Sequence, residues 1–582
     1  MEFLDWAVYV LSKVLFLVRL FLLFLSCCGY IQYLRKYVRT EFCYGLLFSG
    51  ISCVLFFAGI LNILPAAAWF LFLGGLYFMI SSLRQNKRIT DLICPGTVFF
   101  LLLAAFFAVV LYGAKFAHYD NFTHWAVAPR ILVEARRFPN FEDQNFLFIA
   151  YPLGSTCFIY YFSEITGAAD EWIMMYAQAI LMTGMLVSLF ALSSGRVRSL
   201  MTAFFCVCLI CCNNSICDLL VDTLLSITAV SAAAYCVYYG KDMKDRLWPL
   251  IFYAVFLFTI KNSGLLFIAV LYGYVWFTLR RESIPARSWL LLLAIPILTL
   301  ILWKAHVRLV FPSGMSSPHS MTVSKFQSTF AELQSSDISQ ILKMIALKTF
   351  SPSNHALWIL ALGAVVYCIA KFMGASQDAE RCGRVVLFAV ICYLLYQVGI
   401  IGMYLFSMSR LEALRLAGYG RYHRTIEAFL AGLVFLGAIP LIPASRIPLR
   451  LKTTPPVYLI LFCLVLSCFA LSPEFKMLGR QRLDQYDTGR MRIRLEQLKK
   501  DYSIPEESDI MLITNPDNAY FMSFLAQYVL RPSELYVRTE DELTLDGLSY
   551  IDYIIVFDES EKTKVFLSEL SPGFSEPVYH LF

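Results

Sequence analysis

Long apolar runs separated by short polar connections make up most of the chain between residues 5 and 471. A bilayer core about 30 Å thick is crossed by about 20 residues of helix, and lipid offers no partner for backbone polar groups. The runs therefore predict an α-helical polytopic membrane protein with about fourteen spans. We expect them at residues 5–28, 43–60, 65–82, 96–117, 171–194, 199–213, 217–238, 247–260, 264–280, 287–310, 355–372, 384–406, 424–444 and 455–471.

Composition supports the same fold class. Of the 582 residues, 59% are hydrophobic and only 15% are charged, whereas an ordinary soluble chain has about 25% charged residues. The first run lacks the basic start and the small-residue cleavage pattern of a signal peptide, so we expect it to be a retained span. The two runs that meet at residues 261–264 could instead form one broken element.

The distribution of Lys and Arg predicts the orientation, because cytoplasmic loops of membrane proteins collect these residues. Basic residues fall on alternate, short connections: Arg35, Lys36, Arg39, Arg84, Lys87, Arg88, Arg196, Arg198, Lys241, Lys244, Arg246, Arg280, Arg281, Arg287, Lys371, Arg381, Arg384, Arg446, Arg450 and Lys452. The long connections 118–170, 311–354 and 407–423, with the tail after residue 473, are then extracytoplasmic. The predicted location is the cell membrane, with multiple passes.

The tail is more polar than the rest and contains a different alternation of elements. It predicts strands at 510–514, 535–539 and 551–557, and a helix at 517–530 that begins at Asn515 and Pro516. Alternating strands and helices favour a parallel sheet. We expect N-terminal additional helices at 1–95, a transmembrane core at 96–472 and an extracytoplasmic α/β domain at 473–582. Residues 480–500 predict a helix, lying either on the membrane surface or in solvent.

The stretch after the fourth predicted span contains the first candidate for chemistry. Residues 119–125 read YDNFTHW, which places Asp120 at the outer mouth of a helix. A carboxylate there can accept a proton from a sugar hydroxyl as that hydroxyl attacks an activated anomeric carbon. In a continuing helix His124 would share a face with Asp120. The simpler alternative is a polar cap and an interfacial anchor.

Other ionisable residues are predicted to lie at the same outer edge of the membrane as Asp120. Lys261 and Arg421 could stabilise the negative charge on a phosphate leaving group, or could merely extend toward lipid headgroups. Asp218 and Asp222 lie four residues apart at the outer start of a span. Carboxylates at that depth often face the protein interior and carry function, although helix capping explains Asp218 equally well.

An acidic residue follows a predicted outward span, then come His124 with Trp125, the Phe138-Pro139 pair and a helix led by Tyr151-Pro152. This order of motifs resembles the fold C (GT-C) membrane glycosyltransferases of the bacterial type. Lys261 resembles the basic turn after the paired helices of that family. Glu412, followed by Arg421 and Tyr422, resembles its late outer-loop pattern.

The resemblance implies an enzyme that takes a sugar from a polyprenyl-phosphate or polyprenyl-diphosphate donor held in membrane lipid. The acceptor would be a cell-surface glycan, a lipid or a protein. Asp120 and His124 would be catalytic, whereas Tyr151, Lys261, Glu412, Arg421 and Tyr422 would bind donor or phosphate. Asp218 and Asp222 join this binding group because of their predicted depth in the membrane, not because of the resemblance.

One departure from the family pattern concerns metal binding. Relatives often carry two acidic residues in tandem, where this chain has Asp120 followed by Asn121. Glu142 or Asp143 could supply the second carboxylate. We expect no cofactor and no required divalent metal.

Other classes of function are less consistent with the sequence. The net charge of +6 is spread over many loops, so nucleic-acid binding is not expected, and no GxxxxGK[ST] phosphate loop is present. A flippase or transporter of lipid-linked oligosaccharide would suit the number of spans, but it usually has repeat-related halves. A surface-polysaccharide polymerase or ligase is a second alternative.

Overall fold

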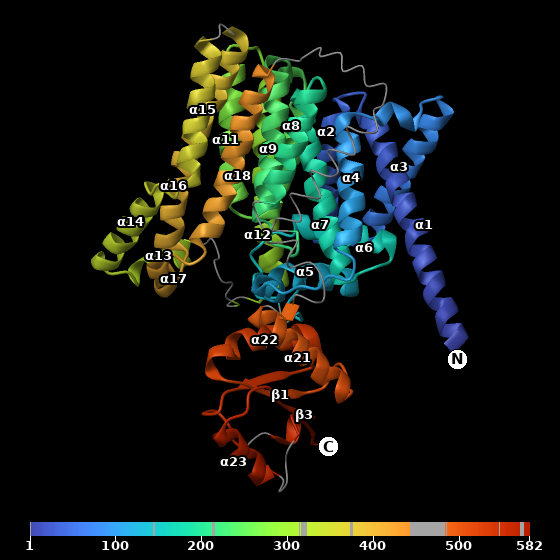
Figure 1. Ribbon diagram of the computed structural model, residues 1–582, viewed down its shortest axis with the longest axis vertical. Coiled ribbons are helices and arrows are strands. Elements are labelled where there is room, and N and C mark those ends of the chain that lie inside the picture. The colour runs from blue at the N-terminus through green and yellow to red at the C-terminus, as the bar shows by residue number, and fades with distance from the viewer. Residues whose placement is uncertain are drawn as a thin grey trace.

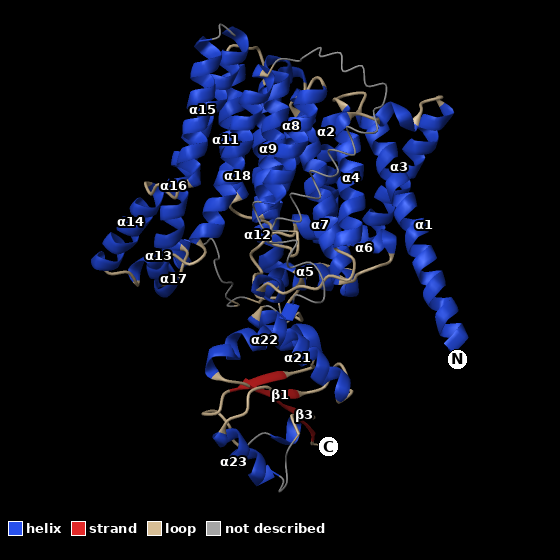
Figure 2. Cartoon of the chain, viewed as in Figure 1, coloured by secondary structure: helices blue, strands red, loops and turns tan. Residues whose placement is uncertain are grey.

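The protein consists of a body of long helices and a small C-terminal region that contains both helices and strands (Figures 1 and 2). It is described by a computed structural model that covers residues 2–143, 146–211, 216–312, 315, 323–372, 376–442, 483–484, 486–545, 548–570 and 576–581.

Every predicted span up to residue 444 overlaps a helix in the described part of the chain. These helices are α1 (Glu2–Leu34), α2 (Thr40–Ile60), α3 (Leu64–Arg84), α4 (Pro95–Val110), α7 (Glu171–Leu186), α8 (Arg196–Cys211), α9 (Asp222–Tyr239), α10 (Trp248–Ile260), α11 (Gly264–Leu279), α12 (Ala286–Val310), α15 (His355–Phe372), α16 (Ser376–Phe406) and α18 (Tyr419–Ala438). The remaining predicted span, at 455–471, lies outside the described residues.

Length and composition identify nine helices of the described part that could cross a membrane. They are Val10–Leu34, Thr40–Ile60, Leu64–Arg84, Glu171–Leu192, Asp222–Asp245, Ala286–Val310, His355–Phe372, Gln377–Phe406 and Tyr419–Leu441. Helices α4, α10 and α11 are apolar but shorter. The fold is consistent with a multi-pass helical membrane protein, whereas the total of fourteen spans stays a prediction.

The outer faces of several helices expose large apolar side chains. Phe70 and Leu73 of α3, and Leu293 and Ile297 of α12, are each more than half exposed. Contiguous apolar surface of this kind is unfavourable in water and favourable in lipid. The exposed faces therefore support the membrane assignment independently of helix length.

Short helices and long connections gather at one end of the helical body. The N-terminal end of α1, the helices α5 (Val127–Ala135), α6 (Gly154–Thr166), α13 (Val323–Ala331), α14 (Ser335–Thr349) and α17 (Arg410–Arg415), and the C-terminal region all lie toward this end (Figure 1). We call it the docking end, because the C-terminal region packs against the helical body there. The predicted outer connections thus share one end of the body in the structure.

Helices α10 and α11 form an antiparallel hairpin rather than one broken element. The residues just after α11 return to the start of α10, where Glu282 lies 3.2 Å from Lys241 and 3.7 Å from Lys244. The turn at residues 261–263 therefore lies at the docking end, as the sequence predicted for Lys261.

The C-terminal region contains a four-stranded sheet in the order β2-β1-β3-β4. Its elements are α21 (Asp487–Asp501), β1 (Ile510–Ile513), α22 (Pro516–Leu530), β2 (Leu535–Arg538), β3 (Tyr553–Val556), α23 (Glu561–Leu570) and β4 (Val578–His580). Strand β1 pairs in parallel with β2 and β3, as predicted, and β4 adds an antiparallel edge that was not predicted. Asn515 caps α22 by accepting a hydrogen bond from the backbone N–H of Asn518.

Candidate functional site

The segment that carries Asp120 is held by its own turn and by a neighbouring loop. Residues Asn121–Trp125 form a single π-helical turn, closed by a 3.0 Å hydrogen bond from the N–H of Ala126 to the carbonyl of Asn121. The buried side chain of Asn121 accepts a hydrogen bond from the N–H of Leu219 at 3.0 Å. Asn121 thus ties the two loops together through its side-chain oxygen.

Arg421 approaches Asp120 from the opposite part of the chain. Gly418 precedes α18 with a φ of 70°, a left-handed conformation that glycine adopts without strain, and Arg421 follows in the first turn of the helix. Its Nη1 donates a hydrogen bond to Oδ2 of Asp120, 301 positions away in sequence. Its Nε lies 3.6 Å from Oδ2 of Asp222. One guanidinium therefore bridges two carboxylates.

Lys261 completes an alternating set of charges. Its Nζ donates to Oδ1 of Asp222 at 2.8 Å, and both side chains are only 12 to 13% exposed. Asp120, Asp222, Lys261 and Arg421 form what we call the charge cluster. Each member comes from a different segment: the loop after α4, the start of α9, the turn between α10 and α11, and the start of α18.

Tyr422 lies against both cations of the charge cluster. Its ring centroid is 5.3 Å from Nζ of Lys261 and 5.2 Å from Cζ of Arg421, distances that allow cation–π attraction. Nη2 of Arg421 also donates to the Tyr422 hydroxyl at 3.4 Å. Burial lowers the pKa of Lys261, but Asp222, Tyr422 and Tyr151 raise it, so the amine stays charged.

Asp218 lies close to the cluster but behaves differently. Its Oδ1 accepts a hydrogen bond from the N–H of Leu220 at 2.9 Å. Burial, reinforced by Asp120 and Asp222, raises the pKa of Asp218 to about 8 against the opposing effect of that hydrogen bond. At neutral pH this carboxyl is therefore mostly protonated, and the cluster keeps two anions and two cations.

His124 is enclosed by aromatic rings instead of facing Asp120 across an α-helical turn. The ring centroids of Trp125, Phe146, Phe148 and Tyr151 lie 4.6 to 5.5 Å from its imidazole. Neither ring nitrogen has a hydrogen-bond partner among the described residues. Burial, with a contribution from Lys261, lowers the pKa of His124 to about 3. In this arrangement His124 and Tyr151 pack the loop, and the predicted catalytic role of His124 stays a prediction.

Glu412 is placed outside the charge cluster. It closes a capping box on α17, in which the N–H and the hydroxyl of Ser409 donate to its Oε2 at 3.1 and 2.8 Å. The carboxylates suggested for metal binding are also engaged elsewhere, because Arg137 pairs with Glu142 at 3.2 Å and with Asp143 at 2.7 Å. Among the described residues, no group of three or more His, Cys, Asp or Glu side chains could hold a metal ion.

Two cavities lie near the charge cluster without including its members. One, of about 940 Å³, runs along α18 past Gly420, the residue before Arg421, and past Arg424, three residues after it. The other, of about 1070 Å³, lies between the helical body and the C-terminal region. Its charged residues, including Glu171 and Arg492, were not singled out from the sequence. The sequence shows only that Glu171 lies at the start of a predicted span and that Arg492 lies in a predicted polar helix. Neither position indicates that the two residues pair across hundreds of positions.

The charge cluster has the groups that a transfer from a phosphate carrier needs. Asp120 supplies a carboxylate that can accept a proton, and Arg421 and Lys261 supply two cations for an anion. Arg421 is 33% exposed and Asp120 22%, so both can be reached by a ligand. Comparison of the chain with models of known protein families, with curated proteins and with solved structures finds no match.

Proposed function

We propose that this protein is an integral membrane glycosyltransferase that moves a sugar from a polyprenyl-phosphate or polyprenyl-diphosphate carrier to a glycan, lipid or protein acceptor. The observation that carries the proposal is the charge cluster. Four ionisable side chains from four distant segments meet at the docking end, where lipid headgroups would lie if the exposed apolar faces span the bilayer. Charges that are partly withdrawn from water are costly, and such clusters are typical of functional sites.

The proposed reaction assigns a separate task to each end of the cluster. The acceptor hydroxyl oxygen attacks the anomeric carbon of the donor sugar while Asp120 takes the hydroxyl proton. The bond between the anomeric carbon and the phosphate oxygen breaks, and the electron pair leaves with the phosphate. Arg421 and Lys261 stabilise that negative charge, with the planar guanidinium suited to a phosphate.

The ion pair between Asp120 and Arg421 has a specific meaning in this scheme. Without donor, the guanidinium neutralises the carboxylate. A donor phosphate would compete for Arg421, which is the more exposed of the two cations, and would free Asp120 to act as a base. Asp222 would keep Lys261 and Arg421 together throughout. The basic loops at the other end of the body favour an extracytoplasmic site.

Transfer of labelled sugar in membranes tests the proposal. Membranes containing Asp120→Asn should lose transfer from polyprenyl carrier to acceptor by a factor of about 10² to 10⁴, the usual contribution of a general base. The matched control is Asp378→Asn, an exposed carboxylate near the start of α16, outside the cluster. Equal transfer by the two variants contradicts the mechanism. Movement of lipid-linked sugar between leaflets without a new glycosidic bond would establish a transporter instead.

A further inference from the structure

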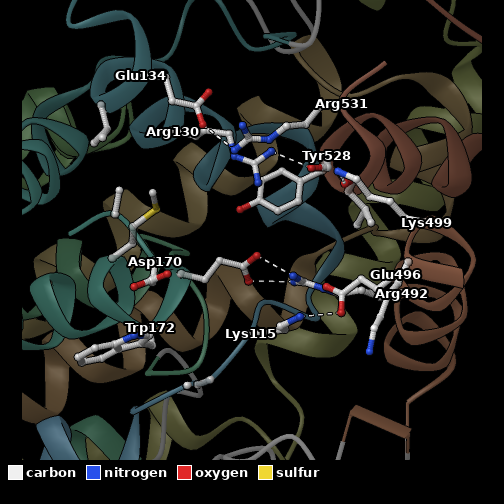
Figure 3. A pocket seen from close by; sticks show the side chains of 18 of the residues that line it. Lys115, Arg130, Glu134, Asp170, Trp172, Arg492, Glu496, Lys499, Tyr528 and Arg531 are labelled. Carbon is white, nitrogen blue, oxygen red and sulfur yellow. Dashed lines mark hydrogen bonds and ion pairs between the residues drawn. The ribbon is translucent and has the colours of Figure 1, made fainter. Parts of the chain in front are cut away.

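The cavity between the helical body and the C-terminal region has a strongly charged lining (Figure 3). We call it the junction pocket. Its volume of about 1070 Å³ reaches the upper end of the range of about 300 to 1,000 Å³ that holds drug-sized ligands. Its lining includes seven basic and four acidic side chains. Positive charge is therefore in excess.

One wall of the junction pocket is already saturated with ion pairs. Arg492 donates to Glu171 through two nitrogens, at 2.6 and 2.9 Å, and lies 2.9 Å from Glu496. Lys115 donates to Glu496 at 2.6 Å. This wall joins the C-terminal region to the body, and its charges compensate one another.

The wall formed by α5 and α22 has fewer ion pairs. Arg130 forms no ion pair among the described residues, and its Nη1 donates only to the carbonyl of Tyr528 at 2.7 Å. Its guanidinium stacks on the Tyr528 ring, 3.6 Å from the centroid. The hydroxyl of Tyr528 is buried and has no partner among the described residues. A cation and an unused hydroxyl are thus held together beside an open volume.

We propose that the junction pocket binds an anionic saccharide, which, if the protein is a glycosyltransferase, is part of the acceptor. Arg130 and Lys500 would attract its carboxylate or phosphate groups. Asp170, and Glu134 beside its 2.6 Å ion pair with Arg531, would accept hydrogen bonds from its hydroxyls, which a purely phosphate-binding site would not need. Charged side chains outnumber aliphatic ones in the lining, so an isoprenoid or acyl chain is a poor match.

Two further observations fit a sugar ligand near the reaction. Tyr112 and Trp172 line the pocket with their ring centroids 5.1 Å apart, and amphipathic aromatic rings of this kind contact sugar rings by their faces. Helix α22, which contributes Tyr528, also packs on the segment of Asp120. The ring centroid of Phe521 lies 5.7 Å from that of Tyr119 and 6.1 Å from that of Phe122. A ligand in the pocket is therefore one helix away from the charge cluster.

Binding to the full-length protein in phosphatidylcholine nanodiscs tests the proposal without any transfer step. The probes are a tetrasaccharide with alternating uronate residues and a neutral tetrasaccharide of equal length, measured by calorimetry. Arg130→Gln should raise the Kd of the uronate probe by about tenfold or more, since a hydrogen bond between charged groups is lost. Arg130→Lys should restore part of the affinity.

The control variant is Lys562→Gln, an exposed residue of α23 that pairs with Asp541 away from the pocket and should bind as the parent does. If Arg130→Gln lowers the unfolding midpoint, Tyr528→Phe, which removes only the unpartnered hydroxyl, replaces it and should weaken binding severalfold. Equal affinity for the two probes, or an unchanged Kd in both pocket variants, overturns the proposal.

Two additional arms separate this inference from its alternatives. Asp120→Asn should bind the uronate probe normally, so that a failed transfer assay and a failed binding assay remain distinguishable. Nanodiscs with phosphatidylglycerol test a lipid headgroup as the occupant. If Arg130→Gln alters only the retention of phosphatidylglycerol, and the saccharide does not bind, the pocket is a lipid site and the proposal is wrong.

Discussion

Arg492 of α21 forms a two-pronged ion pair with Glu171, the first residue of α7 and 321 positions earlier in the chain. The side chain of Arg492 is only 4% exposed, and it also donates to the carbonyl of Phe116 at 2.6 Å. The same Glu171 accepts a hydrogen bond from the N–H of Phe116. A single buried guanidinium therefore joins the C-terminal region to the loop that leads to Asp120.

Replacing Arg492 by Met should destabilise the protein strongly. The carboxylates of Glu171 and Glu496 would lose their buried partner, and breaking such a pair costs about 3 to 5 kcal/mol. Arg490→Met is the matched control, since Arg490 lies two residues earlier on the same helix, is 55% exposed and pairs with Asp487 in solvent, where a pair contributes about 0 to 1 kcal/mol. Thermal unfolding of both variants in detergent should give a lower midpoint for Arg492→Met than for Arg490→Met. Equal midpoints would show that the ion pair does not anchor the region.

Arg421→Lys should lower sugar transfer although the charge is kept. A single ammonium cannot keep the hydrogen bond to Asp120 while a second nitrogen lies 3.6 Å from Asp222, and losing a charged hydrogen bond costs about 1.5 to 3 kcal/mol, or about 10- to 150-fold in rate. Arg424→Lys, on the same helix, alters an exposed residue that donates only to the Gly420 carbonyl among the described contacts. Rates of transfer by the two variants are compared at equal protein level. Similar rates would remove Arg421 from the proposed mechanism.

The membrane helices were largely visible in the sequence because lipid imposes one strong rule, a long apolar helix. The same rule placed Asp120, Lys261 and Arg421 at one end of the body, since each falls at or next to a connection that is predicted to face outward. It could not show that Arg421 bridges Asp120 and Asp222, because pairings over hundreds of positions depend on how the helices pack.

Two residues illustrate opposite failures of sequence reasoning at the site. For Glu412 a local signal existed, since Ser409 three residues earlier forms the S-x-x-E pattern of a capping box, and that local role is the one the structure describes. For His124 the expected α-helical spacing to Asp120 does not apply, because the turn is π-helical and its aromatic neighbours come from a later part of the loop. Packing, rather than spacing, determines the surroundings of this imidazole.

Asp218 should make stability depend on pH in the range from about 4 to about 8. Because the pKa of Asp218 is raised from 3.8 to about 8, the folded state holds a proton there that the unfolded state has lost. Stability therefore falls as the pH rises through this range and levels off above it. Asp218→Asn cannot ionise, so its unfolding midpoint should match that of the parent near pH 4 and exceed it increasingly up to pH 8. A constant difference at all pH values would mean that the carboxyl does not titrate in this way.

Labelling of single cysteines should place the docking end on the extracytoplasmic side. Lys241→Cys lies in the short connection after α9, at the end of the body where the basic residues collect, whereas Ser560→Cys lies just before α23 in the C-terminal region. A thiol reagent that does not cross membranes should label the cysteine at position 560 in intact cells, and the cysteine at position 241 only after permeabilisation. The parent chain, whose described cysteines are mostly buried, measures the background. Labelling in the reverse order would put the charge cluster in the cytoplasm, where the donor proposed here would have to be presented on the inner leaflet.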